Sequence, residues 1–242
     1  MVRPNPSRSK VHGCHLVGSI SGCLDAHTAF TECAKRMPNR LKRFPDGETG
    51  ERTYFVMWQF LLFMNSDVSQ IVAPFEMNKA APQKHFSPEE IDKLNTQLSQ
   101  MHLDTRYDEA AIESYAVFKK LKNEGVIPKQ AKFQVCLPTS VNVAIIVYQQ
   151  FRAKAFDVHE AALLRAMRKV QDEIPHEELS IQIDLAIDTA LWEGLWETPW
   201  HDNPKGSQIE YILRMISQVD QDVELGIHNC YGMLHDEVAR AF

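Results

Sequence analysis

The sequence predicts an α/β protein built around a parallel β-sheet, and three observations lead to that class. Short apolar runs alternate with helical patterns along the 242 residues, which is typical of consecutive βαβ units. Polar residues cluster directly after several of these runs, where the ligand sites of parallel sheets lie. No repeat, linker or low-complexity tract divides the chain. We therefore expect one domain over 12–242, preceded by a flexible tail at 1–11.

The first predicted strand is VHGCHLVGSI at 11–20. A helix follows and ends at Pro38; its apolar residues share one face (Ala26, Phe30, Cys33, Ala34 and Met37). The second predicted strand is the short RLKRF at 40–44, which leads into the polar turn PDGETGER at 45–52. The apolar run at 54–63 is too short to span a bilayer, which takes about 20 residues, so we expect a buried helix there.

Residues 52–124 form a long helical connection in this prediction. Ser87 is placed as an N-cap with Pro88 at the first helical position, and Glu90 can close a capping box. A further helix is predicted at about 107–122, ended by a glycine and a proline.

Three more strands are predicted in the second half, at 131–137, 178–187 and 223–229. Helices are expected at 141–152, 157–173 and about 207–219, the last burying a set of aliphatic residues (Ile209, Ile212, Leu213 and Ile216). An open doubly wound sheet and part of a (β/α)₈ barrel both fit this pattern. Neither GxGxxG nor GxxxxGK[ST] follows a strand, which disfavours the nucleotide-binding open sheets.

Composition narrows the function classes. The 26 basic and 32 acidic side chains give a formal net charge of −6, which argues against a nucleic-acid partner. The N-terminal residues contain no apolar signal-peptide region, and nothing predicts a membrane partner. The five cysteines are odd in number and unclustered, which suits reduced thiols in a cytoplasmic protein (Cys14, Cys23, Cys33, Cys136 and Cys230).

Two polar groups are candidate substrate-binding residues. Asp46, Glu48 and Arg52 follow the second strand and could hold a cationic or carboxylate-bearing ligand, or fix the turn by pairing with each other. Solvated charges on a glycine-rich turn are the alternative. Gln182 and Asp184 share one face of a buried strand, where polar groups are costly unless they face a site or a polar network.

His228 and Cys230 are the candidate metal ligands. Alternate residues of a strand face the same way, so the imidazole and the thiol would converge, and both are zinc-ligand types. A lone His or Cys is more often a packing residue. No second ligand pair at metal spacing occurs elsewhere, so this is half of a site at most.

Segments at the strand ends resemble a known group, in order from about residue 12 to 235: HLVGSI, RFPDGETGER, FQVCLPTSV, IPHEELSIQIDLAID and GIHNCYG. They look like bacterial and fungal barrel proteins related to the C-terminal domain of cobalamin-independent methionine synthase and to uroporphyrinogen decarboxylase. The resemblance implies an incomplete (β/α)₈ TIM-barrel type fold, with about five of eight units present. It also implies three further strands outside this chain, and hence a shortened gene model or a cloned fragment rather than an evolved minimal barrel.

The likeness to the synthase rests on three elements. Gly18-Ser19 resembles the segment that holds the amino-acid substrate, so Ser19 is expected to bind substrate. Gln182-Ile183-Asp184 resembles the start of its Gln-Ile-Asp-Glu-Pro segment, and residues 228–231 resemble its zinc-binding His-Met-Cys-Tyr. Leu185 departs from the synthase, which has an amine-binding Glu there, and this puts homocysteine in doubt as the substrate.

Three functions follow. The first is zinc-dependent methyl transfer to a thiol, impaired in a chain with half a zinc site. The second is a metal-free, uroporphyrinogen-decarboxylase-like enzyme, in which Arg52 would help to bind a polycarboxylate. The third is a non-catalytic, truncated barrel that acts as an accessory or interaction protein. An incomplete barrel exposes parallel strand edges, so oligomers through those edges are expected.

Overall fold

Four parallel strands form one sheet in the order in which they occur in the chain. The computed structural model describes residues 13–74, 84–195 and 203–230. The strands are β1, β2, β3 and β4, at Arg43–Pro45, Lys132–Pro138, Leu179–Leu185 and Glu224–Asn229. The α/β class and the parallel sheet are confirmed. The described sheet is open, so the barrel stays a prediction.

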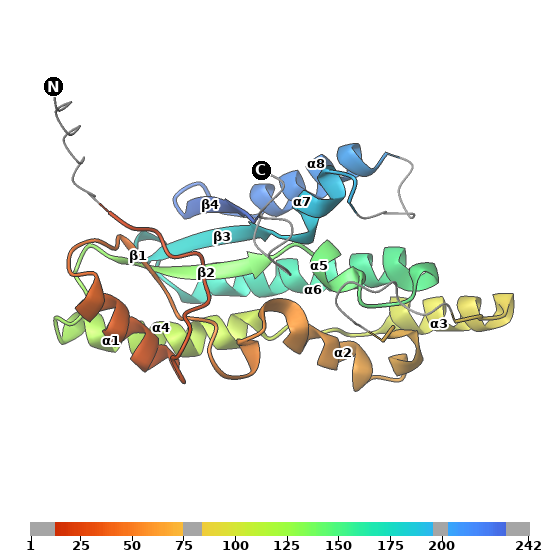
Figure 1. The fold of residues 1–242 in the computed structure, drawn as a ribbon, viewed down its shortest axis with the longest axis horizontal. Helices are drawn as coiled ribbons and strands as arrows, with labels where there is room; N and C mark the ends of the chain where they lie inside the picture. The colour runs from red at the N-terminus through yellow and green to blue at the C-terminus, as the bar shows by residue number, and fades with distance from the viewer. Residues whose placement is uncertain (1–12, 75–83, 196–202, 231–242) are drawn as a thin grey trace, which may run out of the picture.

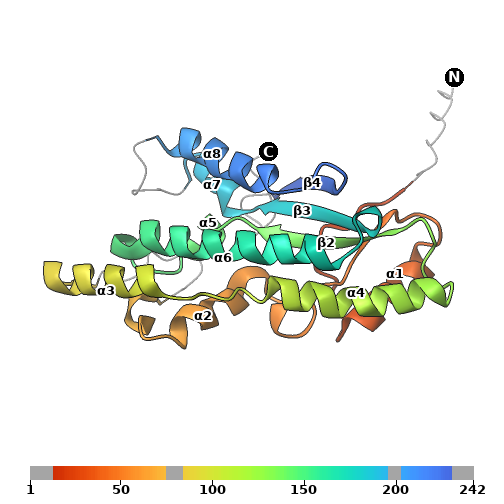
Figure 2. The same ribbon diagram turned by 180° about the vertical axis from the view of Figure 1, so that it is seen from behind.

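Helices cover one face and one flank of the sheet (Figures 1 and 2). They are α1 (Ala26–Arg36), α4 (Tyr107–Asn123) and α6 (Arg152–Glu173), and α6 runs along the sheet in both views. Apolar side chains of these helices and the strands form a first core (Phe30, Phe118, Phe133, Leu163, Val170, Ile181 and Ile183 among them). The odd-numbered side chains of β2 and β3 belong to this core. The polar, even-numbered side chains of the two strands (Gln134, Gln182 and Asp184) therefore lie on the opposite face, which we call the inner face.

A helical extension lies beyond the carboxyl ends of the strands (Figure 1). It consists of η1 (Gly50–Arg52), η2 (Phe55–Gln59), α2 (Phe60–Met64), η3 (Ser69–Ile71) and α3 (Pro88–Gln100). With the short α5 (Val141–Ala144), η4 (Gln149–Phe151) and α6, it encloses a second core (Phe60, Phe63, Leu94, Leu98, Val143 and Phe151 among others).

Two predictions within this extension can be compared with the structure. The capping box is confirmed, since the Ser87 hydroxyl accepts from the Glu90 amide at 3.2 Å and the Ser87 amide donates to the Glu90 carboxylate at 2.7 Å. The apolar run at 54–63 is helical but buried on one side only, because Tyr54 is 76% exposed.

The first predicted strand is wrong over its described residues. Segment 13–20 makes only two isolated bridges, Cys14 with Leu41 and Ser19 with Gly47. Its carbonyls bond to side chains of the sheet instead of to a neighbouring strand, and a glycine at φ 139° interrupts it at position 18. The segment therefore lies across the inner face. The second strand lies at 43–45 instead of 40–44.

The predicted buried face of the last helix is wrong in part. This helix, α8 (Pro204–Ser217), follows α7 (Ile187–Trp192) and buries Tyr211 and Met215. Of the predicted residues, Ile212 and Ile216 are partly buried and pack against the apolar cores, while Ile209 and Leu213 are 49% and 56% exposed. Tyr211 faces inward, where its ring packs against Phe156 and its hydroxyl donates to the buried carboxylate of Asp188 at 2.5 Å. Apolar packing and a long-range hydrogen bond together hold this rotation of the helix.

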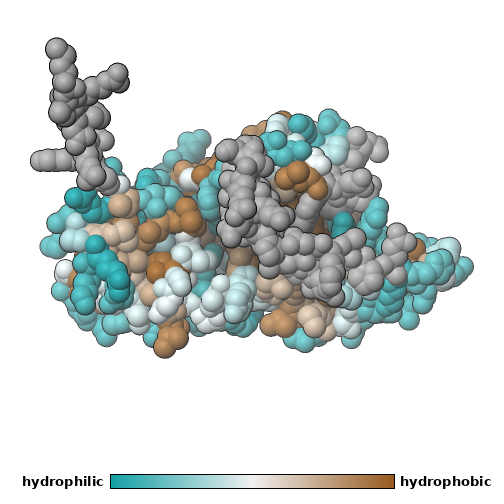
Figure 3. Space-filling view, in the orientation of Figure 1, coloured by the Kyte–Doolittle hydropathy of each residue, from teal (hydrophilic) through white to brown (hydrophobic). Residues whose placement is uncertain are grey.

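The surface is mixed in character. Figure 3 shows polar side chains gathered over both ends of the molecule, with separate apolar patches between them. Within the described ranges, no helix has the length and apolarity needed to cross a membrane. The predicted tail at 1–11 lies outside the described residues.

Candidate functional site

The turn after β1 is anchored by an ion pair between two predicted site residues. Asp46 accepts hydrogen bonds from the Arg52 guanidinium at 2.6 and 3.4 Å, from the Ser114 hydroxyl at 2.8 Å and from the Glu48 amide at 3.0 Å. Both carboxylate oxygens are therefore engaged, and the charge of Arg52 is compensated. This pair fixes the turn against α4, and its charges are not left for a ligand.

Glu48 is the carboxylate of this turn that the ion pair leaves unneutralised. It has a left-handed backbone at φ 49°, and its side chain accepts a hydrogen bond from the Ser19 hydroxyl. A side chain at Gly18 would crowd it, since an added Cβ would lie 3.2 Å from Glu48 Oε1. Burial, reinforced by the negative charges of Asp184 and Asp46, raises the pKa of Glu48 to about 7 despite the Ser19 hydrogen bond.

A chain of hydrogen bonds runs over the inner face of β3 and β4. His15 Nε2 donates to Gln182 Oε1 at 2.8 Å, and Gln182 Nε2 donates to Asp184 Oδ1 at 2.7 Å. His228 Nδ1 donates to the same Asp184 oxygen at 3.0 Å. Gln182 Nε2 also bonds to the Val17 carbonyl at 2.9 Å, which fixes the orientation of the amide. The chain leaves Nε2 of His228 as the nitrogen that can accept a proton or bind a partner.

The charges of this chain influence one another. Burial raises the pKa of Asp184, although the hydrogen bonds from His228 and Gln182 oppose that shift. The hydrogen bond to Asp184 raises the pKa of His228, and the charge of Glu48 adds to the effect. Asp184 thus bonds to the half-buried imidazole of His228, and Glu48 acts on that imidazole through its charge. The site is a cluster of two carboxylates and one imidazole.

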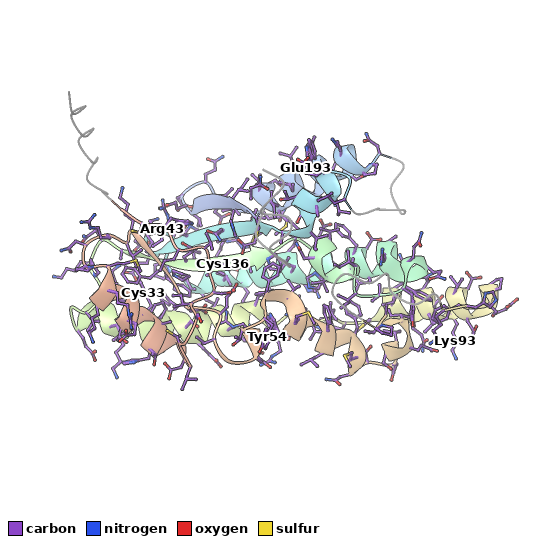
Figure 4. The ribbon with its side chains drawn as sticks, viewed as in Figure 1. Cys33, Arg43, Tyr54, Lys93, Cys136 and Glu193 are labelled. Carbon is purple, nitrogen blue, oxygen red and sulfur yellow. The ribbon has the colours of Figure 1, made fainter. Side chains whose placement is uncertain are left out.

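Two neighbouring residues of β2 complete the inner face. Gln134 Nε2 donates to the Leu16 carbonyl at 2.9 Å and to Gln182 Oε1 at 3.1 Å, while its buried Oε1 has no hydrogen-bond partner. Burial, with the charges of Asp184 and Glu48, raises the pKa of Cys136 and keeps it a thiol. Figure 4 places Cys136 over the middle of the sheet. A small cavity of about 10 Å³ adjoins these residues, lined in part by Asp46, Glu48, Arg52, Tyr107, Gln134 and Cys136.

His228 and Cys230 do not make up a metal site with the other described residues. β4 ends at Asn229, so Cys230 lies just outside the strand, where its amide donates to the Leu185 carbonyl at 2.9 Å. No three His, Cys, Asp or Glu side chains of the described ranges are grouped to hold a metal ion. Zinc binding therefore stays a prediction, and no step below depends on it.

The structure gathers the predicted residues into two connected groups. Ser19 contacts Glu48, and Asp46 pairs with Arg52. Gln182, Asp184 and His228 share one hydrogen-bond chain. The sequence interpretation missed three residues (His15, Gln134 and Cys136). The two on β2 could have been found, since they alternate on one face of a predicted strand.

Comparison with known protein families, curated proteins and solved structures finds no match to this chain. The resemblance to methionine-synthase-like barrels therefore stays a prediction from the quoted segments.

Proposed function

We propose that the inner face of the sheet binds a small amino thiol and prepares its sulfur for methyl transfer. The observation that carries this proposal is the interaction of two largely buried carboxylates, Glu48 and Asp184, in one cluster. Glu48 and Asp184 interact through their charges; His228 hydrogen-bonds to Asp184, whereas Arg52 and His15 act on the two carboxylates only through their charge. A substrate ammonium group would add a positive charge to this cluster.

In this proposal each residue has a distinct role. Glu48 and Asp184 receive the ammonium group, and Ser19 orients the Glu48 carboxyl group. His228, held at Nδ1 by Asp184, takes the thiol proton at Nε2, because only a thiolate is an effective nucleophile. The sulfur would then attack the methyl group of a donor, and the bond between that methyl group and the donor would break. The resemblance of residues 15–20 and 226–232 to methionine-synthase-like proteins supports this reaction class.

The ion pair of Arg52 weighs against the polycarboxylate alternative. That alternative needs a free cation, whereas the Arg52 guanidinium is bonded to Asp46 at 2.6 Å and is largely buried. Asp184 and Glu48 would in addition repel an anionic substrate. We therefore place the decarboxylase-like function second.

Isothermal titration calorimetry with small thiols and a porphyrin tests the proposal. Homocysteine and cysteamine carry an ammonium group, 4-mercaptobutanoate lacks it, and a tetracarboxylate porphyrin represents the alternative. We expect the amino thiols to bind at least about tenfold more tightly than 4-mercaptobutanoate, which corresponds to about 1.4 kcal/mol. At pH 7, ammonium binding should release up to about half a proton, because it ionises Glu48, whose pKa is about 7.

A matched pair of variants locates the binding group. Glu48→Gln should lose the preference for amino thiols and the proton release. Glu51→Gln should keep both, because Glu51 belongs to the same turn but is exposed and paired with Arg106 at 2.9 Å. Equal binding of all three thiols would refute the proposal. Tight porphyrin binding that depends on Arg52 would favour the decarboxylase-like function.

A further inference from the structure

A cluster of side chains joins the C-terminal part of α6 to the loop between α8 and β4. Arg168 donates to both carboxylate oxygens of Asp220, at 2.9 and 2.7 Å, and to Asp172 at 3.1 Å. Gln171 donates through Nε2 to the Gln218 carbonyl at 3.0 Å and accepts from the Asp220 amide at 2.8 Å. These contacts lie at the starts of the strands, at the opposite end of the sheet from α7 (Figure 1).

His176 extends this cluster and faces two acceptors. It begins η5 (His176–Glu178), directly before β3. Its Nδ1 lies 2.8 Å from Asp222 Oδ1, and its Nε2 lies 3.1 Å from the Gln171 carbonyl oxygen. An ionised carboxylate and a carbonyl can only accept, whereas a neutral imidazole has one N–H group. Both contacts are therefore hydrogen bonds only when the imidazole is protonated and both of its nitrogens donate.

We propose that His176 is a pH-dependent clamp, which in its protonated form holds the loop before β4 against α6 and η5. Loss of the proton removes one of the two hydrogen bonds and the attraction to the carboxylates of Asp220 and Asp222. The bonds of Arg168 and Gln171 do not depend on that proton, so the loop remains attached at Asp220. The change is therefore confined to the residues between Asp220 and the start of β4.

The charged groups around His176 set the pH at which this clamp opens. Asp222 and Asp220 approach it from the loop, at 2.8 and 3.7 Å. Lys132 of β2 donates to the His176 carbonyl oxygen at 3.3 Å, and Arg168 of α6 is bonded to Asp220. The hydrogen bond to Asp222 raises the pKa of His176 above the ordinary 6.5, and the second hydrogen bond and the two negative charges add to the shift, against the effect of burial.

The sign of the pH dependence follows from this direction. The folded chain keeps the proton of His176 at a pH where the unfolded chain has lost it. The stability that the clamp adds is therefore fully present below pH 6.5, and it is lost as the pH rises through the raised pKa.

The amide of Val223 reports on the state of the clamp. It donates to the Asp220 carbonyl at 3.0 Å, and Val223 is only 6% exposed. Opening of the loop exposes this amide to exchange with solvent. We expect its protection factor, which corrects for the intrinsic pH dependence of exchange, to fall about tenfold when His176 loses its proton, the effect of one hydrogen bond to a charged group.

Nuclear magnetic resonance tests the clamp on the full chain. Both ring nitrogens of His176 should carry a proton at about pH 6, and the imidazole should titrate above pH 6.5. Asp222→Asn should move this titration back towards pH 6.5 and lower the protection factor of Val223 at about pH 6. Asp67→Asn, at an exposed position in another loop, should change neither.

His176→Gln separates a clamp that titrates from a static contact. Glutamine can donate to Asp222 but does not titrate, so the protection factor of Val223 should become independent of pH between about 6 and 9. A His176 that titrates at or below pH 6.5, or a Val223 amide whose protection is unchanged while His176 titrates, would overturn the proposal. If His176→Gln does not fold, the titration of the unmodified chain and of Asp222→Asn decides the matter.

Discussion

Two buried aspartates that are four residues apart in the chain, Asp184 and Asp188, have different surroundings. Asp184 ends the inner face of β3, and Asp188 lies one helical turn further on, in α7. Both are buried, at 4% and 2% exposure, and burial raises the pKa of both. Their hydrogen-bond partners differ. Those of Asp188 connect elements of the fold, whereas those of Asp184 belong to the candidate site.

The surroundings of Asp188 are neutral and fully bonded. Its carboxylate accepts from the Thr139 hydroxyl at 2.9 Å, from the Asn142 amide at 3.1 Å and from the Tyr211 hydroxyl at 2.5 Å. Its backbone carbonyl accepts from Gln208. These donors come from the end of β2, from α5 and from α8, so Asp188 joins three elements. No titratable partner with a pKa near neutrality touches it through these bonds.

Asp184 is instead part of a group that can change its charge. Its partners are an amide and the half-buried imidazole of His228, and it acts electrostatically on Glu48. Burial alone therefore does not distinguish a candidate site, because both aspartates are buried. The titratable neighbours of Asp184, Glu48 and His228, distinguish it from Asp188.

The largest expected effect is the loss of stability when the carboxylate of Asp188 is removed, compared with that of Asp184. Asp188→Ala leaves the buried hydroxyls of Thr139 and Tyr211 without their acceptor and removes one hydrogen bond of Asn142, which keeps its bond to Thr139. We therefore expect a loss of about 4 kcal/mol in the free energy of unfolding. Asp184→Ala should cost less than about 1 kcal/mol, because Gln182 keeps the Val17 carbonyl and His228 can turn to water. Urea denaturation of both variants measures the difference. Equal losses would mean that the two networks are structurally equivalent.

The second effect is the pH dependence of stability that Glu48, the neighbour of Asp184, should cause. The pKa of Glu48 in the folded chain, about 7, lies above its ordinary value of 4.5. The unfolded chain therefore ionises this group first, and its contribution to stability is lost as the pH rises from about 4.5 to 7. Glu48→Gln should be more stable than the unmodified chain by up to about 3 kcal/mol above pH 7, and the gap should close towards pH 4.5. Urea denaturation across this pH range measures it, and a gap independent of pH would contradict the assigned environment.

Particular residues show what could be read from the sequence and what could not. The capping box at Ser87 and the buried strand with Gln182 and Asp184 follow from local patterns, and both are found where expected. The segment at 11–20 has a strand-like composition, but its carbonyls are taken by glutamine side chains from distant strands, and no local pattern contains that choice. The rotation of α8 depends likewise on long-range contacts of Tyr211, with the ring of Phe156 and the carboxylate of Asp188.

The same limit applies to the roles of the site residues. Asp46, Glu48 and Arg52 were expected together, and they do lie together. Only the geometry shows that two of them neutralise each other and leave the third. Asp46 is also held by the hydroxyl of Ser114, which lies 68 residues from it in the chain, so part of this arrangement is set by the tertiary fold.

The smallest of the three effects is the loss of stability in acid that His159, close to the surroundings of Asp188, should cause. This residue is fully buried in α6; its Nε2 donates to Gln59 at 3.2 Å and its Nδ1 accepts from Ser140 at 2.8 Å, next to the Thr139 that holds Asp188. Burial lowers its pKa to about 3 from an ordinary 6.5. Below pH 6.5 the unfolded chain therefore takes up a proton that the folded chain refuses, and stability falls by about 2 kcal/mol by pH 5.

Substitution at this position should reduce the sensitivity to acid. His159→Gln lacks the titrating group, so its free energy of unfolding should change less between pH 6.5 and 5 than that of the unmodified chain, by about 2 kcal/mol. His85→Gln, at an exposed position, should leave the pH dependence unchanged. If both variants follow the unmodified curve, His159 is protonated in the folded chain. The region around Thr139 and Asp188 would then carry a charge that titrates, as the surroundings of Asp184 do, and the contrast between the two aspartates would be lost.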